Sequence, residues 1–125
     1  MVQQQLIILI IDDCSEDRAV YRRYLLQDSQ HHYVILEEET GESALKLCQQ
    51  LQPDSILLDF LFPDMDGLEF LTELKQQSKG SMPAVIMLTG HGNENVAVQA
   101  MKSGVQDYLV KGDITAESLR LKQNS

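Results

Sequence analysis

Residues 56–67 read ILLDFLFPDMDG, an apolar run that ends on Asp59 and gives way to Asp64 and Asp66. Short runs rich in Ile, Leu and Val without polar alternation are typical of parallel strands covered on both faces. Similar runs occupy residues 6–11, 56–58, 84–88 and 108–110. A weaker run, residues 33–36, leads into three glutamates and is expected to form an edge strand.

The segments between these runs place apolar residues at helical spacing. They cover residues 15–27, 42–51, 68–77, 93–102 and 116–122. Strand and helix thus alternate five times, which predicts an α/β fold with a doubly wound, five-stranded parallel sheet and right-handed crossovers. At 125 residues the chain is expected to form one domain, residues 1–125. The last helix is expected to be short, barely two turns.

Composition limits the partners and the compartment. The chain is 43% hydrophobic, with a net charge of -9 and a pI near 4.6. This acidity disfavours direct binding to nucleic acid or to an anionic membrane and suits a cation site. No apolar run reaches the roughly 18 residues of a membrane span, and no signal peptide is recognisable, so we expect a cytoplasmic protein. Cys14 and Cys48 lack metal-binding spacing and are expected to be reduced thiols.

The predicted fold indicates where chemistry can occur. In an open α/β sheet, ligands bind beyond the carboxyl ends of the strands. The polar residues at those strand ends are Asp12, Asp13, Asp59, Thr89 and Lys111. We therefore expect three carboxylates, one hydroxyl and one ammonium group to converge on one edge of the sheet.

This set of groups is suited to a phosphoryl group. Three adjacent carboxylates repel one another and favour binding of a cation, and Mg2+ prefers oxygen ligands. A cation, an ammonium and a hydroxyl can neutralise the oxygens of a transferring phosphoryl group. Carboxylates can accept such a group as an acyl phosphate. Asp59 stands alone at its strand end and is the candidate nucleophile, whereas Asp12 and Asp13 form a pair that can hold the metal.

The chain resembles the receiver domains of response regulators in two-component signalling, including those of chemotaxis regulators. The resemblance covers nearly the whole length and rests on LIILIIDDCSEDR, GESALKLCQQLQPDSILLDFLFPDMDGLEFL, AVIMLTG and KSGVQDYLVK. It implies a flavodoxin-like (β/α)5 fold with strand order 2-1-3-4-5. It also implies a phosphoacceptor that is no enzyme toward other substrates and catalyses only its own phosphorylation and dephosphorylation.

The resemblance implies a role for each site residue. Asp59 would accept a phosphoryl group from a histidine kinase or a histidine phosphotransfer protein. Asp12, Asp13 and Asp59 would hold Mg2+ together with the backbone carbonyl of Leu61. Thr89 and Lys111 would contact the phosphoryl group, and Thr89 and Tyr108 would report phosphorylation to an output that the sequence leaves unidentified.

Several of these residues have simpler interpretations. Asp12 or Asp13 could cap the first helix, although Ser15 suits that role as well. Tyr108 could be an ordinary strand aromatic, and Thr89 an ordinary residue at a strand end. The PDMDG stretch has turn chemistry, so Asp64 and Asp66 are expected to shape the entry to the third helix rather than to take part in the site.

Other functions fit the sequence less well. A calcium loop built on DMDG would begin at Phe62, which offers no side-chain oxygen. A Mg-dependent aspartyl phosphatase of the haloacid dehalogenase type would need an Asp-x-Asp pattern that DDCSED lacks. A histidine phosphotransfer module would be a helical bundle. A receiver-like module that docks a partner without being phosphorylated remains the main alternative.

Two features depart from the family pattern. Many receivers have Lys-Pro after the fifth strand, whereas Lys111 is followed by Gly112, which leaves the geometry of that peptide bond open. The short final helix favours the hypothesis that the sequence is a receiver module of a longer protein, such as a hybrid kinase or a multidomain regulator.

Overall fold

The structure, a computed structural model, describes residues 5–28, 31–78, 82–90 and 94–123. Its centre is a five-stranded parallel sheet with the order β2-β1-β3-β6-β7. The strands are β1 (Gln5–Ile11), β2 (His32–Glu38), β3 (Ser55–Asp59), β6 (Ala84–Thr89) and β7 (Asp107–Val110). Since β6 and β7 are the fourth and fifth strands of the sheet, the expected order 2-1-3-4-5 is confirmed, and β2 is an edge strand.

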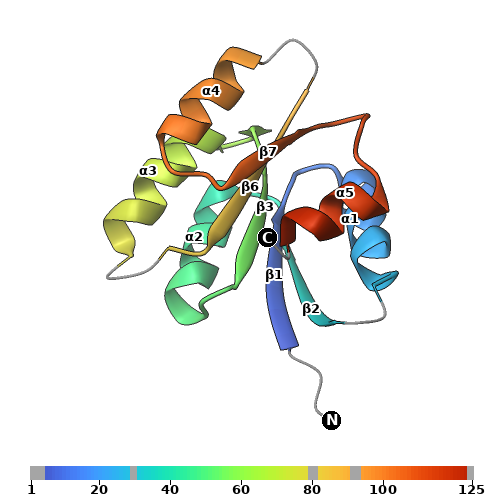
Figure 1. Ribbon diagram of the computed structural model, residues 1–125. Helices are drawn as coiled ribbons and strands as arrows, with labels where there is room; N and C mark the ends of the chain where they lie inside the picture. Colours follow the sequence, from blue (N-terminus) through green and yellow to red (C-terminus); the bar gives the residue numbers. More distant parts are fainter. Residues whose placement is uncertain (1–4, 29–30, 79–81, 91–93, 124–125) are drawn as a thin grey trace.

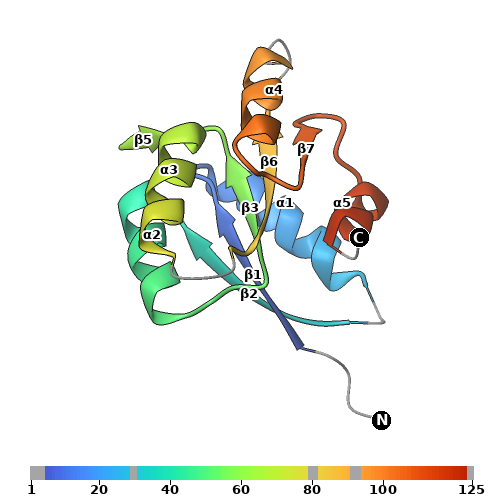
Figure 2. The ribbon, with the colours of Figure 1, turned by 60° about the vertical axis from the view of Figure 1, so that its left-hand side comes forward.

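Helices cover both faces of the sheet. They are α1 (Ser15–Leu26), α2 (Gly41–Gln50), α3 (Gly67–Gln77), α4 (Glu94–Lys102) and α5 (Ala116–Gln123). Figures 1 and 2 show α1 and α5 on one side of the sheet and α2, α3 and α4 on the other. The α5 helix has eight residues, as short as the sequence predicts. Among the described residues, no helix combines the length and apolarity needed to cross a membrane.

The three central strands, β1, β3 and β6, are apolar along most of their length because each contributes side chains to two cores. The core beneath α2, α3 and α4 contains Leu9, Ile11, Ile56, Leu58, Val85 and Met87 from the strands. The core beneath α1 and α5 contains Ile8, Ile10, Leu57, Ile86 and Leu88. Successive strand residues point to opposite faces, so burial of both faces removes the polar alternation of a half-exposed strand. The three central strands are thereby buried up to their carboxyl ends.

The segment after Asp59 contains an element that the sequence did not predict. Strands β4 (Leu61–Phe62) and β5 (Met65–Asp66) form a small antiparallel hairpin between β3 and α3. Gly67 follows it, and its N–H donates to the carbonyl of Phe60 at 2.6 Å. A Cβ atom on Gly67 would lie 2.9 Å from the Met87 side chain. The absence of a side chain therefore lets the start of α3 approach the backbone at the end of β3.

The two carboxylates of PDMDG have structural roles, as predicted. Asp66 caps α3, its side chain accepting the N–H of Glu69 at 2.8 Å. Asp64 instead reaches across to α2, where its two oxygens accept the N–H groups of Gly41 and Glu42 at 2.9 Å each. Unsatisfied N–H groups at a helix start are good donors to a carboxylate. Asp64 thus fastens the hairpin to a helix that is distant in sequence.

Candidate functional site

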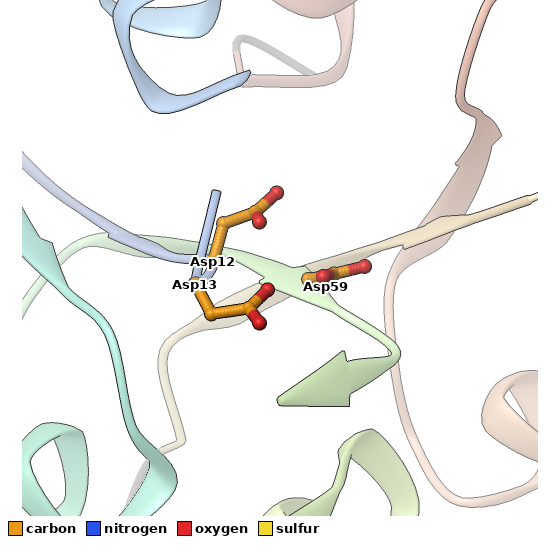
Figure 3. Close-up of side chains that lie close together, drawn as sticks. All are labelled: Asp12, Asp13 and Asp59. Carbon is orange, nitrogen blue, oxygen red and sulfur yellow. The ribbon is translucent and has the colours of Figure 1, made fainter. Parts of the chain in front are cut away.

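The sheet brings the predicted carboxylates together at its carboxyl edge. Asp12 and Asp13 directly follow β1, and Asp59 ends β3, the neighbouring strand, where Ile11 pairs with Leu58. One oxygen from each of the three carboxylates lies within 4.8 Å of the others. Figure 3 shows the side chains of Asp12 and Asp13 extending toward the side on which Asp59 lies. The expected acidic cluster is therefore present.

Burial and mutual repulsion make it unfavourable for all three carboxylates to be ionised unless positive charge lies beside them. Asp12 is fully buried and Asp59 is 9% exposed, whereas Asp13 lies at the surface. Burial and the adjacent charge of Asp12 raise the pKa of Asp59 from 3.8 to about 6, against the opposing influence of Lys111. Desolvation and like charge both disfavour the ionised form. A bound cation would restore it, and three carboxylate oxygens suit a hard divalent ion.

Lys111 supplies one positive charge to the cluster. Its Nζ atom lies 2.9 Å from Asp12 Oδ2, 3.2 Å from Asp59 Oδ1 and 3.1 Å from Asp17 Oδ2. Burial by itself lowers the pKa of Lys111, but the hydrogen bond to Asp12 and the charge of Asp59 outweigh it and raise the pKa. Lys111 is therefore a permanent cation beside the candidate nucleophile.

Asp17 is a member of the site that the sequence did not predict. It lies in the first turn of α1, where an acidic residue is usually explained by the helix dipole. The contact with Lys111 joins residues 94 positions apart. Because only the fold brings α1 to the end of β7, the sequence carried no specific signal for this pair.

Thr89 and Tyr108 lie in the strands that the sequence predicts for them, whereas Leu61 lies in the unpredicted strand β4. Thr89 ends β6 and is 2% exposed, and its carbonyl accepts the N–H of Lys111 at 2.7 Å. Tyr108 lies in β7 and is 36% exposed. Leu61 begins β4, with an exposed side chain. The structure therefore gathers the three aspartates and Lys111, with Thr89 on the adjoining strand.

The backbone after Lys111 takes a form suited to glycine. Among the described residues no peptide bond is cis, so Lys111 and Gly112 are joined by a trans bond. Gly112 has a φ of +95°, a conformation that proline cannot adopt. This chain therefore orients Lys111 without the proline of the common family pattern.

Comparison with known sequences gives one consistent result. The family model described as "Response regulator receiver domain" matches residues 8–122. The regulatory protein LuxO of Vibrio cholerae is 41% identical over 86 residues, which are 69% of this chain and 18% of LuxO. The chemotaxis protein CheY of Listeria monocytogenes is 37% identical over 75 residues, 60% of this chain and 61% of CheY. The chain thus spans less than two thirds of either relative.

Solved structures agree with this result. A response regulator receiver domain protein from Clostridium thermocellum is 30% identical, with a TM-score of 0.83, covering 95% of this chain and 91% of that one. The receiver domain of NtrX from Brucella abortus is 31% identical, with a TM-score of 0.76, covering 91% and 92% of the two chains. The likeness extends over the whole fold and not only over the acidic cluster.

Proposed function

Since this chain belongs to the response regulator receiver domain family, we propose that Asp59 is the residue that accepts the phosphoryl group. The observation that carries the proposal is the position of Asp59 at the end of β3. It is nearly buried there, between two other carboxylates and the ammonium group of Lys111. In this setting a carboxylate can act as a nucleophile while the charge that builds up around it is neutralised.

The proposed reaction transfers a phosphoryl group from a phosphohistidine of a histidine kinase or a histidine phosphotransfer protein. A carboxylate oxygen of Asp59 forms a bond to phosphorus as the bond between phosphorus and the imidazole nitrogen breaks. The imidazole nitrogen keeps the electron pair. Lys111 stabilises the added negative charge on the phosphoryl oxygens. Water later cleaves the acyl phosphate, which returns Asp59 to its carboxylate and releases inorganic phosphate.

The donor set fits Mg2+, which would be held by Asp12, Asp13, Asp59 and the backbone carbonyl of Leu61. The first three offer oxygen atoms within 4.8 Å of one another, and oxygen is the ligand that Mg2+ prefers. When bound, the ion supplies positive charge to the phosphoryl oxygens. Asp12 is prepared for this role because the N–H of Cys14 holds its Oδ1 atom at 2.9 Å.

Thr89 and Tyr108 are the proposed reporters of phosphorylation. The hydroxyl of Thr89 would hydrogen-bond to the phosphoryl group, and the ring of Tyr108 would change orientation. The backbone bond from Lys111 to Thr89 supports this coupling, because it joins the ends of β6 and β7 beside the site. Phosphorylation would then shift the population between two arrangements of α4, β7 and α5.

Residues 1–125 would form a single receiver domain that catalyses only its own phosphorylation and dephosphorylation. The proposed setting is the cytoplasm, and neither nucleic acid nor membrane is a proposed direct partner. Output would be delivered through a further domain or a separate effector. The acidic composition and the family of the chain support these points.

Incubation with phosphoramidate and MgCl2, followed by intact mass measurement, tests the proposal. The wild-type chain should gain one phosphoryl group, and Asp59→Asn should gain none. Beryllofluoride should bind the wild-type chain only. An unchanged mass together with no binding of beryllofluoride would contradict the proposal and favour a docking module that is not phosphorylated.

A further inference from the structure

Arg18 is a buried charged residue that lies beside the metal-binding pair. It projects from the second turn of α1 and is 8% exposed. Its Nη1 donates to the backbone carbonyl of Asp12 at 2.6 Å. Its Nε and Nη2 donate to Glu37 at 2.9 Å and to Glu39 at 3.2 Å. One planar guanidinium thus joins the loop after β1 to the end of β2.

The carbonyl that Arg18 holds is part of the peptide group between Asp12 and Asp13. Fixing this oxygen fixes the plane from which both carboxylates project. Two other bonds restrain the same residue: Asp12 N–H donates to the carbonyl of Glu38 at 3.1 Å, and Asp12 Oδ1 accepts from Cys14. Within the described part of the chain, the bond from Arg18 restrains the carbonyl side of Asp12. Groups that orient metal ligands affect metal affinity without touching the metal.

A cation beside a cation site would by itself weaken Mg2+ binding. Glu37 and Glu39 offset this effect because they neutralise the guanidinium. Burial tends to raise the pKa of Glu37, but hydrogen bonds from Arg22 and Arg18 outweigh it and lower the pKa, so Glu37 is ionised at neutral pH. The charge of Arg18 is therefore compensated on the side away from Asp12.

Arg22 shows what a purely structural arginine does in the same network. It pairs with Glu37 at 2.6 Å and donates to the carbonyl of Ile35 at 3.2 Å. Among the described residues, its hydrogen bonds and ion pair are all with β2, and its side chain is 40% exposed. Arg18 and Arg22 thus share Glu37 but differ in their contact with the metal-binding loop.

We propose that Arg18 is a positioning residue that sets the direction of the Asp12 and Asp13 carboxylates for Mg2+. The inference rests on the proposed metal site. It assigns Arg18 no contact with the ion or with the phosphoryl group. Its effect passes through the Asp12 carbonyl, and the guanidinium geometry is needed because it serves Asp12 and two glutamates at once.

The test is a calorimetric titration of the folded protein with MgCl2, which measures the dissociation constant without any phosphoryl transfer. Arg18→Met should weaken Mg2+ binding about tenfold, because loss of an orienting partner typically costs that much. Arg22→Met, the matched control, should change the dissociation constant by no more than about twofold, because Arg22 bonds to Glu37 and Ile35 of β2 and not to the metal-binding loop. Arg18→Lys keeps the positive charge but loses the planar guanidinium that donates to three acceptors, and it should also bind Mg2+ more weakly than the wild type.

The sign of the change distinguishes positioning from simple electrostatics, because loss of a positive charge alone would tighten Mg2+ binding. Unchanged or tighter binding in Arg18→Met would overturn the inference. If circular dichroism shows that Arg18→Met is unfolded, Arg18→Lys decides, and wild-type affinity in that variant would overturn it.

Failure of the proposed phosphoacceptor function has a separate signature. A wild-type chain that binds Mg2+ yet gains no mass with phosphoramidate would contradict phosphorylation of Asp59, while the Arg18 comparison would still decide the inference. A wild-type chain that binds no Mg2+ would overturn the inference itself.

Discussion

Asp59→Asn should stabilise the metal-free protein, although it removes the proposed phosphoacceptor. The pKa of Asp59 rises from 3.8 to about 6 on folding, chiefly because of burial and the charge of Asp12. This shift is about 2 units, and each unit corresponds to about 1.4 kcal/mol. Ionised Asp59 therefore costs the folded state about 3 kcal/mol at pH 7.5, and an uncharged amide of the same shape avoids that cost.

The pH dependence follows from the sign of the shift. The folded state keeps the proton on Asp59 to a higher pH than the unfolded chain does. The destabilisation caused by ionised Asp59 is therefore absent below the ordinary pKa of 3.8. It grows as the pH rises from 3.8 to about 6 and is complete above that range. The gain from Asp59→Asn should be about 3 kcal/mol at pH 7.5 and about half of that at pH 5.

Urea-induced unfolding, followed by circular dichroism in the presence of EDTA, measures both values. Asp64→Asn is the control of opposite sign, because Asp64 accepts two backbone N–H groups and an amide has only one acceptor oxygen. That variant should lose stability. Two results would show that ionised Asp59 does not destabilise the fold in this way. One is equal stability of wild type and Asp59→Asn at pH 7.5, and the other is a larger gain in unfolding free energy at pH 5 than at pH 7.5.

Four further outcomes are expected. Glu37→Gln should lower the free energy of unfolding by about 1 kcal/mol at pH 7, since this carboxylate pairs with two arginines. Folding lowers the pKa of Glu37, so its contribution to stability is present above the ordinary pKa of 4.5 and is lost as the pH falls through the lowered value. Urea unfolding of the wild type and of Glu37→Gln should therefore give equal stabilities in acid. Asp64→Ala should cost about 1 kcal/mol, because the N–H groups of Gly41 and Glu42 at the start of α2 lose their acceptor, and native-state hydrogen exchange should be faster there; unaltered exchange would rule out this role. Gly112→Pro should cost more than about 1 kcal/mol, because proline cannot reach a φ of +95°, and a thermal unfolding midpoint equal to that of the wild type would show that the backbone adapts. Saturating MgCl2 should raise the thermal unfolding midpoint of the wild type and EDTA should reverse the effect, whereas Asp13→Ala should respond much less; an equal response in both would place the ion elsewhere.

Much of the fold could be predicted because its signals are local. The apolar run before Asp59 has no polar alternation, and this alone indicates a strand covered on both faces, as β3 is. The principal site residues could be predicted for a related reason. The carboxyl ends of parallel strands meet at one edge, so Asp12, Asp59 and Lys111 follow from the ends of three apolar runs.

The missed features depend on contacts between segments that are distant in sequence. The β4–β5 hairpin has only two residues in each strand. Strands this short show no hydrophobic periodicity from which they could be predicted. Asp64 reads as an ordinary turn residue until α2 is placed beside it.

The class of the fold, the succession of the five main strands and helices and the identity of the principal charged groups follow from periodicity and residue type alone. Which of these charges meet depends on how the chain folds. The tertiary structure brings Asp17 to Lys111 and Arg18 to the carbonyl of Asp12, and it buries Asp59 enough to raise its pKa. The physical reason is that the energy of a charge depends on its distance from other charges and on its access to water, and both are set by packing.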